Sequence, residues 1–333
     1  MKGPRMRLGV TVSSLLTLFF MYGQIPTAHA EPNPDLLPVW RDVFMRPDTS
    51  LAAIPSPSTN PLTPAKIRLG GKLFFDTRLS GDNTRSCATC HEPARAFTDG
   101  RQRSTAIDDK TQLLNAPSLF NLAWAKQLFH DARASNLEDQ ARQPVEHPQE
   151  MAGSWPQIIE RLTADPAMTT EFQDAFPEKP VITQQNIIAA IATYERSLIS
   201  PKTRFDRFIA GDDLALSALE LAGFRLFVGK AGCISCHSGW RLSDGKVHNI
   251  GIAGNNSPDA TNRALLIRTP GLRGIAKTAP YMHDGSLPTL QRVIAHYLKF
   301  KQNQIALSPN LVSPLRLSDA EKDALLAFLR TLD

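Results

Sequence analysis

Cysteine is scarce in this chain. The 333 residues include four cysteines, and all four lie in two short segments of the same type, Cys87–His91 and Cys233–His237. Two CxxC disulfides or a zinc site are the ordinary alternatives for such segments, but neither needs a histidine directly after the second cysteine in both copies. Because the two motifs use every cysteine of the chain, we expect them to share one chemistry.

Other features that would indicate a particular class of protein are also missing. The formal net charge of +5 includes three cations near the amino terminus, and the rest of the chain is nearly balanced. No block of basic residues predicts a nucleic-acid partner, and no amphipathic stretch predicts membrane binding. Alternating strand patterns are scarce, whereas many of the 25 prolines lie between segments with helical periodicity. We therefore expect a mainly helical, loop-rich protein with room for two domains of ordinary size.

The two CxxCH motifs predict two covalently bound haems of the c type. Each motif supplies two thiols that can form thioethers with the haem vinyl groups, and the adjacent histidine places a ring nitrogen under the iron as proximal ligand. The predicted attachment residues and proximal ligands are Cys87, Cys90, His91, Cys233, Cys236 and His237.

The amino terminus predicts a secretory signal peptide over residues 1–30. Basic residues precede the apolar run Leu8–Met21, and Ala28–Ala30 offers small residues for cleavage. A membrane-spanning helix needs about 20 apolar residues, so this run is too short for a comfortable anchor. We expect the mature protein to be soluble in the periplasm, with no membrane span after signal cleavage.

An internal repeat organises the rest of the chain. Thr63–Pro64 and Ser217–Glu220 are helix starts, and the phrase Gly-x-x-Leu-Phe follows in each helix, at Gly70 and at Gly223. Each half then closes with a helix whose apolar face we expect in the core. These closing helices are expected at 187–198 and 325–332.

The repeat predicts a mainly α fold of two cytochrome c-like domains, each with one haem. The N-terminal domain is expected at 31–205 and the C-terminal domain at 206–333, with the join near Ser200–Asp213. The helix, the haem motif and the closing helix follow in the same order in both.

The residues alone leave the sixth iron ligands open. The segment after His91, as far as Lys110, contains no Met, His or Tyr, so the first haem has no local candidate, and His130 and His147 are more distant ones. The candidates for the second haem are His248, Met282, His283, His296 and Tyr297.

Four stretches, one of which contains the first motif, follow one another in a fixed order. They are Leu73–Ser80, Ser86–His91, Asn115–Ser118 and Thr278–Gly285. Together they resemble the bacterial dihaem cytochrome c peroxidase and MauG family, and the resemblance runs from about Pro61 to the carboxyl terminus. It implies an enzyme that uses hydrogen peroxide, with a peroxide-reactive haem in the N-terminal domain and an electron-transfer haem in the C-terminal domain.

The resemblance also implies the sixth ligand of the second haem. In the peroxidase branch this ligand is a Met fourteen residues after the His of the Tyr-x-His-Asp-Gly motif, whereas the MauG branch has Tyr there. In this chain the position is Tyr297, and Met282 is the only methionine after Met168. A phenolate is a hard, anionic ligand that favours oxidised iron, whereas a thioether favours Fe(II). We therefore expect His237 and Tyr297 on the second iron.

A peroxide site over the first haem is implied in the same way. The segment from Asp131 to Met151 is similar to the family segment that folds over the open haem face, with Glu150 as acid–base residue and Gln140 and Pro144 near it. Cleaving the O–O bond needs a proton moved from one oxygen to the other, which a partly desolvated carboxylate can do. The residues that match the family's inter-haem calcium site, which uses oxygen ligands, are Asn115, Thr278 and Pro280.

One position departs from the family pattern. Family members usually carry Trp directly before the Asp at the position of Asp131, where it lies between the haems as an electron relay, and this chain has His130. Trp124 lies six residues earlier and cannot be assumed to replace it. His130 could relay electrons by another route or ligate iron, although a hydrogen-bonded packing histidine is the more ordinary role.

Three functions fit these residues. The first is a MauG-like oxidase that uses hydrogen peroxide to form high-valent iron and oxidises residues, Trp foremost, of a partner protein in the periplasm. The alternative is a dihaem cytochrome c peroxidase that reduces peroxide with electrons from a small redox protein. A plain electron-transfer cytochrome is disfavoured, because an open first haem and Glu150 would then be superfluous. Tyr297 separates the first two.

Overall fold

The computed structural model describes residues 37–109, 114–252, 266–299, 307–312 and 314–333. The expected signal peptide, residues 1–30, lies outside these ranges. The described chain contains eleven α-helices, several short 3-10 helices and one two-stranded sheet, so the expected mainly helical fold is confirmed. Within the described ranges, no helix is long and apolar enough to cross a membrane.

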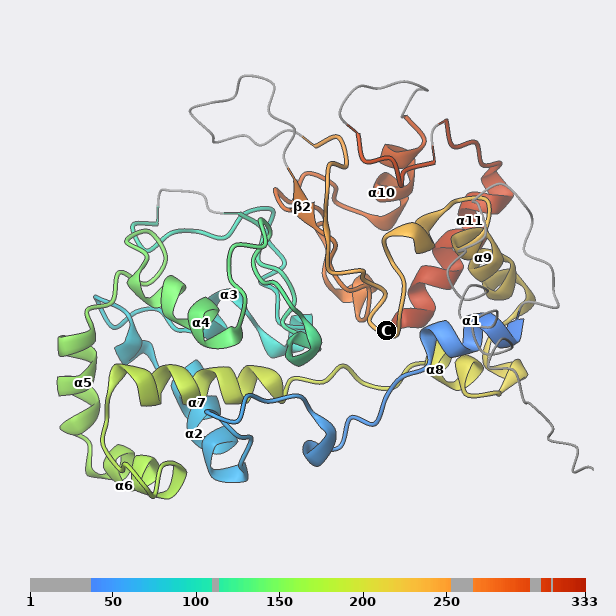
Figure 1. Ribbon diagram of the computed structural model, residues 1–333. Coiled ribbons are helices and arrows are strands. Elements are labelled where there is room, and N and C mark those ends of the chain that lie inside the picture. The colour runs from blue at the N-terminus through green and yellow to red at the C-terminus, as the bar shows by residue number, and fades with distance from the viewer. Residues whose placement is uncertain (1–36, 110–113, 253–265, 300–306, 313) are drawn as a thin grey trace, which may run out of the picture.

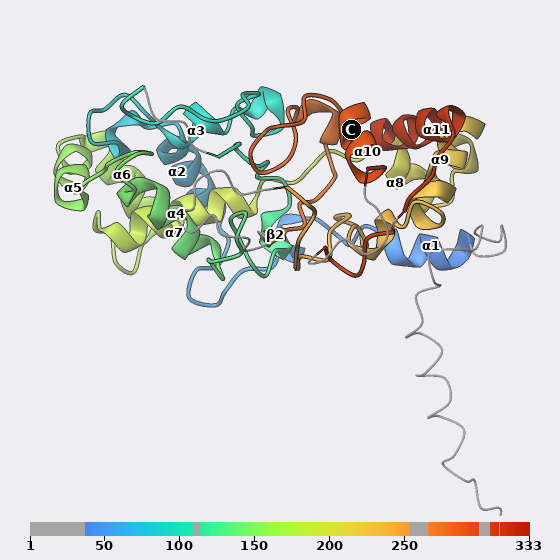
Figure 2. The same cartoon turned by 90° about the horizontal axis from the view of Figure 1, so that it is seen from above.

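Two units lie on either side of a loop-rich middle, as Figure 1 and the view from above in Figure 2 show. The first unit contains α2 (Pro64–Phe74), α3 (Cys87–Cys90), α4 (Leu137–Glu146), α5 (Trp155–Thr163), α6 (Pro166–Ala175) and α7 (Gln184–Arg196). The second unit contains α1 (Leu37–Phe44), α8 (Arg204–Ile209), α9 (Ala218–Val228), α10 (Leu290–Tyr297) and α11 (Asp319–Leu329). The strands β1 (Val247–His248) and β2 (Ile267–Arg268) pair antiparallel.

Each unit is built around one close crossing of two helices. Helix α2 crosses α7 at Gly70, where an added Cβ would lie 2.0 Å from the backbone oxygen of Ala190. Helix α9 crosses α11 at Gly223, where an added Cβ would lie 1.9 Å from the backbone oxygen of Ala324. Only a residue without a side chain lets the two backbones come this close. The Gly-x-x-Leu-Phe repeat therefore marks the same packing in both units.

The helix starts expected from the sequence are also confirmed. The Thr63 side chain accepts a hydrogen bond from the backbone N–H of Lys66 at 3.2 Å, with a proline in the first turn of α2. Ser217 and Glu220 form a reciprocal capping box at the start of α9, and an equivalent box begins α11. These bonds satisfy N–H groups that have no partner inside the helix.

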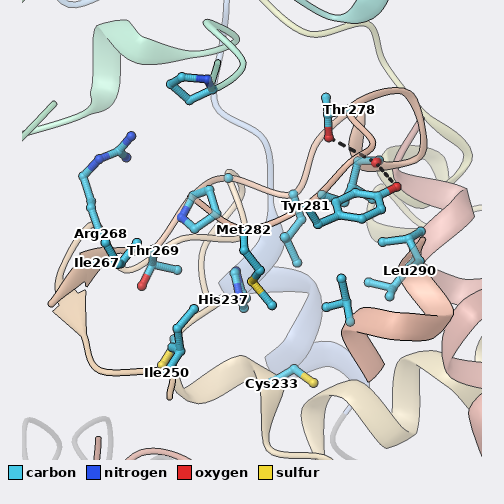
Figure 3. A pocket seen from close by; sticks show the side chains of 18 of the residues that line it. Cys233, His237, Ile250, Ile267, Arg268, Thr269, Thr278, Tyr281, Met282 and Leu290 are labelled. Atoms are coloured by element: carbon cyan, nitrogen blue, oxygen red, sulfur yellow. Dashed lines mark hydrogen bonds between the residues drawn. The ribbon is translucent and has the colours of Figure 1, made fainter. Parts of the chain in front are cut away.

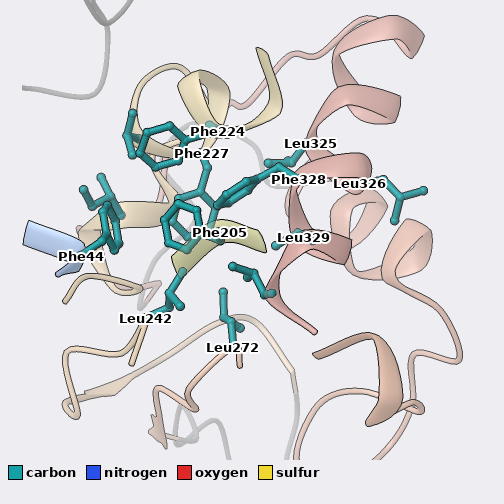
Figure 4. Close-up of a cluster of buried hydrophobic side chains, with 14 of the residues drawn as sticks. Phe44, Phe205, Phe224, Phe227, Leu242, Leu272, Leu325, Leu326, Phe328 and Leu329 are labelled. Atoms are coloured by element: carbon teal, nitrogen blue, oxygen red, sulfur yellow. The ribbon is translucent and has the colours of Figure 1, made fainter. Parts of the chain in front are cut away.

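Phenylalanine dominates the core of the second unit (Figure 4). The rings of Phe205, Phe224 and Phe328 lie within 5.3 to 5.5 Å of one another, centroid to centroid, in edge-to-face or tilted contacts. Such contacts stabilise a core beyond the apolar area they bury. The first unit instead uses leucine and isoleucine of α2 and α7, with Phe74 at the side of the haem motif.

Helix α1 packs in the second core although it comes first in the sequence. Trp40 and Phe44 are buried there, and the Phe44 ring lies 5.6 Å from the ring of Phe205. The N-terminal domain expected from the sequence contains α1 and ends at residue 205, which lies inside α8. A cut at that position would divide α8 and separate α1 from its core.

The loops of the two units are joined by hydrogen bonds to backbone carbonyls. The backbone N–H of Arg268 donates to the carbonyl of His130 at 2.7 Å, and its Nε donates to the carbonyl of Phe129 at 3.0 Å. The backbone N–H of Asn115 donates to the carbonyl of His283 at 3.0 Å. These bonds bring parts of the chain that are far apart in sequence to one place between the units.

Candidate haem sites

The two CxxCH motifs have the same local geometry. In each, the backbone N–H of the histidine donates to the carbonyl of the first cysteine, at 3.0 Å in the first motif and 2.8 Å in the second. His91 Nδ1 lies 3.0 Å from the carbonyl oxygen of Phe97, and His237 Nδ1 lies 2.9 Å from that of Leu242. A carbonyl oxygen can only accept, so Nδ1 carries the proton and Nε2 is left for a metal.

Burial keeps the ionisable groups of both motifs neutral. It lowers the pKa of His91 and of His237, although backbone hydrogen bonds oppose this shift. It also raises the pKa of the Cys87 thiol strongly and that of Cys233 to about 12. A neutral imidazole is the form that binds iron. None of the four cysteines is in a disulfide, so all four can form thioethers with a haem.

A cavity of about 270 Å³ opens on the second motif (Figure 3). This volume is many times the roughly 30 Å³ that one water takes in the liquid. The wall includes Cys233, Cys236 and His237, apolar side chains of α9, α10 and α11, and Tyr297. A large apolar space with two thiols and a metal-binding imidazole on its wall fits a covalently attached haem.

His283 adds a polar group to the same wall. Its side chain is 4% exposed, and neither ring nitrogen has a hydrogen-bond partner among the described residues. An unpaired buried imidazole costs free energy. The cavity therefore also offers a site for a polar group of its occupant, such as a haem propionate.

Two of the candidate sixth ligands of the second haem are engaged elsewhere. His248 Nε2 lies 2.8 Å from Asp244 Oδ2, and its Nδ1 lies 2.9 Å from Ser308 Oγ. His296 Nε2 lies 2.8 Å from the carbonyl oxygen of Ile250. Met282, His283 and Tyr297 line the cavity, as His248 also does.

Tyr297 is the last residue of α10, and its phenol lies beside the second motif. Burial raises its pKa strongly, and the charges of the Cys233 and Cys236 thiolates would raise it further. These two contributions show that the phenol and the thiols are close. The phenol can lose its proton here only if a positive charge compensates, as a ferric iron would.

The predicted peroxide residues follow one another on and after α4. Gln140 and Pro144 lie four residues apart on this helix and so on the same side of it. Glu150 lies in the turn that follows, where its backbone N–H donates to the carbonyl of His147 at 3.0 Å. The Glu150 carboxylate raises the pKa of both thiols of the first motif, which places it near that motif.

The chemistry of these side chains suits proton transfer. Burial raises the pKa of Glu150, whereas the charges of His147 and Arg133 lower it. The Glu150 side chain is 32% exposed, and its Oε1 lies 3.8 Å from His147 Nδ1. Gln140 Oε1 is buried without a hydrogen-bond partner in the described part of the chain. Perturbed pKa values cluster at functional sites, and a buried amide oxygen without a partner is uncommon elsewhere in proteins.

The three residues of the expected calcium site line the cavity together. They are Asn115, Thr278 and Pro280. Asn115 donates from Nδ2 to the carbonyl of Arg101 at 2.8 Å, which turns its side-chain oxygen into the atom available to a cation. Oxygen ligands from an amide and from backbone carbonyls fit calcium.

His130 is held as a buried, neutral histidine. Its Nε2 lies 2.9 Å from the carbonyl oxygen of Asn115, and its ring centroid is 6.3 Å from that of His283. Burial lowers its pKa to about 4. This is the hydrogen-bonded packing role that the sequence allowed, and a role in electron transfer stays a prediction.

Sequence analysis missed one acidic residue near the first motif. Glu195 of α7 is 4% exposed, and its Oε2 has no hydrogen-bond partner among the described residues. Burial raises its pKa to about 8, so it holds a proton at neutral pH. Its charge would raise the pKa of Cys87, which places it beside the first motif. The sequence does contain a signal for this residue, because Glu195 is an acid within the apolar stretch of the closing helix.

The helix crossings show what replaces this acid in the second unit. An added Cβ at Gly70 would lie 2.8 Å from Tyr194 Cβ, and one at Gly223 would lie 2.8 Å from Phe328 Cβ. Tyr194 and Phe328 therefore occupy equivalent positions at the two helix crossings. The residues directly after them are then equivalent too. They are Glu195 in the first unit and Leu329 in the second.

Known proteins share this arrangement. A family model for di-haem cytochrome c peroxidases matches residues 64–214, and a RoxA-like, cytochrome c-like model matches residues 268–300. The methylamine utilization protein MauG of Methylorubrum extorquens is 39% identical over 92% of this chain and 88% of its own length. The cytochrome c peroxidase Ccp of Escherichia coli is 34% identical over 84% of this chain and 60% of its own length.

A solved structure agrees with these relatives. The crystal structure of a MauG-like protein associated with microbial copper homeostasis has a TM-score of 0.77 and 32% identity to this chain, covering 87% of this chain and 93% of that one. Because similarity at this level spans both haem motifs, the chain belongs to the di-haem cytochrome c peroxidase and MauG family of peroxide-dependent oxidoreductases.

Proposed function

We propose that this protein is a MauG-like oxidase, which uses hydrogen peroxide to oxidise side chains, Trp foremost, of a partner protein in the periplasm. Tyr297 is the observation that carries this proposal. It lies on the cavity wall beside the second motif, at the position where the MauG branch has Tyr. His248 and His296, which could have competed as ligands, have ring contacts elsewhere.

In this proposal two haems of the c type are held by the two units. The peroxide-reactive haem is bound in the first unit by Cys87, Cys90 and His91, and the electron-transfer haem in the second unit by Cys233, Cys236, His237 and Tyr297. When bound, the haems supply the redox chemistry that peroxide drives. The Nδ1 bonds of both histidines to backbone carbonyls fix their ring orientation.

Glu150 moves the proton in this mechanism. It takes a proton from one peroxide oxygen and returns it to the other, which leaves as water. Partial burial raises its pKa, so the carboxylate is a stronger base than one in water. Gln140, with its unpaired Oε1, accepts a hydrogen bond from peroxide or water and orients it. Pro144 lies on the same side of α4 and helps to shape the pocket.

Tyr297 determines which oxidation state the second haem prefers. As an anionic ligand it stabilises the ferric state, so we expect the diferric protein to react with peroxide without prior reduction. Asn115, Thr278 and Pro280 would hold calcium between the haem sites. The oxidising equivalents then leave through the surface to the docked partner.

One observation favours a second function, a cytochrome c peroxidase that takes electrons from a small redox protein. Met282 also lines the cavity, and a thioether ligand would raise the potential of the second haem. In that case the second haem would need reduction before peroxide reacts, and no partner protein would be changed covalently.

Spectroscopy of two variants separates these ligand assignments. We expect the ferric protein to show one high-spin and one low-spin haem, and Tyr297→Phe to remove the low-spin signal because the phenolate is lost. Met282→Leu, a change of similar volume on the same wall, should keep that signal. An unchanged low-spin spectrum in Tyr297→Phe would show that another residue is the ligand.

Turnover separates the two functions. Diferric protein is mixed with stoichiometric peroxide, and the haem spectrum is followed before either reduced cytochrome c or a candidate periplasmic protein is added. We expect a reaction without pre-reduction and a mass change in the candidate partner. Fast oxidation of cytochrome c only after pre-reduction, with no covalent change in any partner, would assign the protein to the peroxidase branch.

A further inference from the structure

Two of the four tryptophans meet where the two units join. Trp124 ends the short 3-10 helix Leu122–Trp124 of the first unit, and Trp240 lies three residues after His237 of the second. Their ring centroids are 5.0 Å apart and their planes are inclined by 87°. This edge-to-face geometry is a direct contact between the two aromatic rings.

Each of the two tryptophans lies close in sequence to a residue that belongs to, or packs near, one of the haem motifs. Leu122, two residues before Trp124, is buried in the cluster that contains Phe97 and, at its edge, Cys87. Phe97 is also the residue whose carbonyl orients the proximal histidine of the first motif. Trp240 belongs to the loop that leaves the second motif. The pair therefore links the surroundings of the two motifs through packed side chains and a short stretch of backbone.

The two rings differ in the charge around them. The guanidinium groups of Arg46 and Arg273 lie 5.6 Å and 5.5 Å from the ring centroid of Trp240. Both are paired with Asp206, at 3.6 Å and 2.7 Å. Among the described residues, no cation lies over the ring of Trp124. Because a cation over an indole opposes removal of an electron from it, Trp124 is the ring that is easier to oxidise.

We propose that the Trp124–Trp240 pair is a redox relay between the two haem sites, with Trp124 as the ring on which oxidation rests. The relay deepens the oxidase function proposed above and rests on it. Indole is among the most easily oxidised side chains, whereas the imidazole of His130, which occupies the family's relay position, is much harder to oxidise.

Electrons pass along the proposed relay one at a time. Trp124 gives one electron to the first haem site after peroxide has oxidised it, and becomes an indole radical cation. Trp240 passes one electron to Trp124 and receives one from the second haem site, which the partner protein refills. Two such transfers, together with two protons, account for the reduction of one hydrogen peroxide to two waters. No bond to either indole forms or breaks.

Radical spectroscopy tests where the oxidation rests. The haem-loaded protein is mixed with peroxide, frozen rapidly and examined by electron paramagnetic resonance, with and without ring-deuterated tryptophan. We expect a radical signal that narrows on deuteration and is lost in Trp124→Phe. Trp155→Phe is the matched control, because Trp155 lies on α5 and its indole N–H donates to Glu146 at 2.8 Å. A radical signal that is unchanged in Trp124→Phe would overturn the proposal.

Electron transfer between the haems provides a readout that needs no peroxide. The first haem is reduced by a light flash, and the change at the second haem is followed in time. We expect slower transfer in Trp124→Phe and in Trp240→Phe than in wild type and Trp155→Phe, with haem content and circular dichroism unchanged. Wild-type rates in both variants would refute the relay. Slower rates in a protein that fails to react with peroxide would keep the relay and refute the oxidase function.

Discussion

The two units solve the same packing problem and then diverge around their haem motifs. Both cross two helices at a glycine, and both hold the proximal histidine by a bond from Nδ1 to a backbone carbonyl. The first unit adds a buried acid and an acidic turn after α4, whereas the second has Leu329 at the equivalent place and Tyr297 on its cavity wall. The shared features thus orient the histidines of both motifs, and the differing residues are those to which the proposed function gives separate roles.

The largest expected effect comes from removing Glu150, the proton-transferring residue proposed for the first unit. Glu150→Gln keeps the shape and removes the base, so we expect peroxide-driven oxidation to slow by about 10²–10⁴-fold, the usual contribution of a general acid–base residue. In wild type the rate should fall as the pH drops through the raised pKa of Glu150, because only the ionised form accepts a proton. Stopped-flow spectra at several pH values measure both.

Glu146→Gln is the matched control for this prediction. Glu146 ends the same helix, is exposed and pairs with Arg142, so its loss should leave the rate and the pH profile unchanged. Glu150 would be removed from the mechanism by a variant that reacts at the wild-type rate with both haems bound.

The shared helix crossings can be broken one at a time. Gly70→Ala places a methyl group against the backbone of Ala190, so we expect a loss of about 1–3 kcal/mol or more in the free energy of unfolding. Gly71→Ala meets only the ring of Tyr194, at 3.3 Å, and should be neutral or gain up to about 1 kcal/mol from helix propensity. Gly223→Ala should mirror Gly70→Ala in the second unit. Chemical denaturation followed at each haem band measures the effect.

A similar stability for Gly70→Ala and Gly71→Ala would mean that the crossing is looser than the structure indicates. If both haem bands respond equally to Gly70→Ala and to Gly223→Ala, the two units unfold as one. The two crossings would then be alike in geometry, but they would not stabilise the units separately.

A smaller effect, dependent on pH, comes from the acid that Leu329 replaces in the second unit. The pKa of Glu195 is raised to about 8 in the folded protein, whereas an unfolded Glu titrates near its ordinary value of about 4.3. Between these values the folded state keeps a proton that the unfolded state has released, so the free energy of unfolding falls as the pH rises. Glu195→Gln should remove this fall and raise the melting temperature at pH 8 but not at pH 4.5.

Thermal melts of the haem-loaded protein across this pH range test the expectation, with exposed Glu160→Gln as the control. Parallel melting curves of Glu195→Gln and wild type at every pH would place the acid in an environment that lets it ionise.

The sequence predicts features that are local in the chain. The CxxCH motifs, the capping boxes and the Gly-x-x-Leu-Phe phrase each depend on residues a few positions apart, and the structure confirms the local geometry of all three. An acid within the apolar stretch of its helix marks Glu195, but neither its place beside Cys87 nor the Trp124–Trp240 contact can be predicted from neighbouring residues. Their roles come from segments that meet only when the chain has folded.

The position of α1 sets an order for the assembly of the molecule. This helix is the first described segment of the chain, but the ring of Phe44 contacts Phe205 of α8 and Phe224 of α9. The first unit lies wholly between α1 and these partners and can complete its own core earlier. Closing such a long loop delays folding, so the amino-terminal helix stays without its partners until α8 and α9 are in place. A chain that ends before α9 would therefore also lose the packing of its first helix.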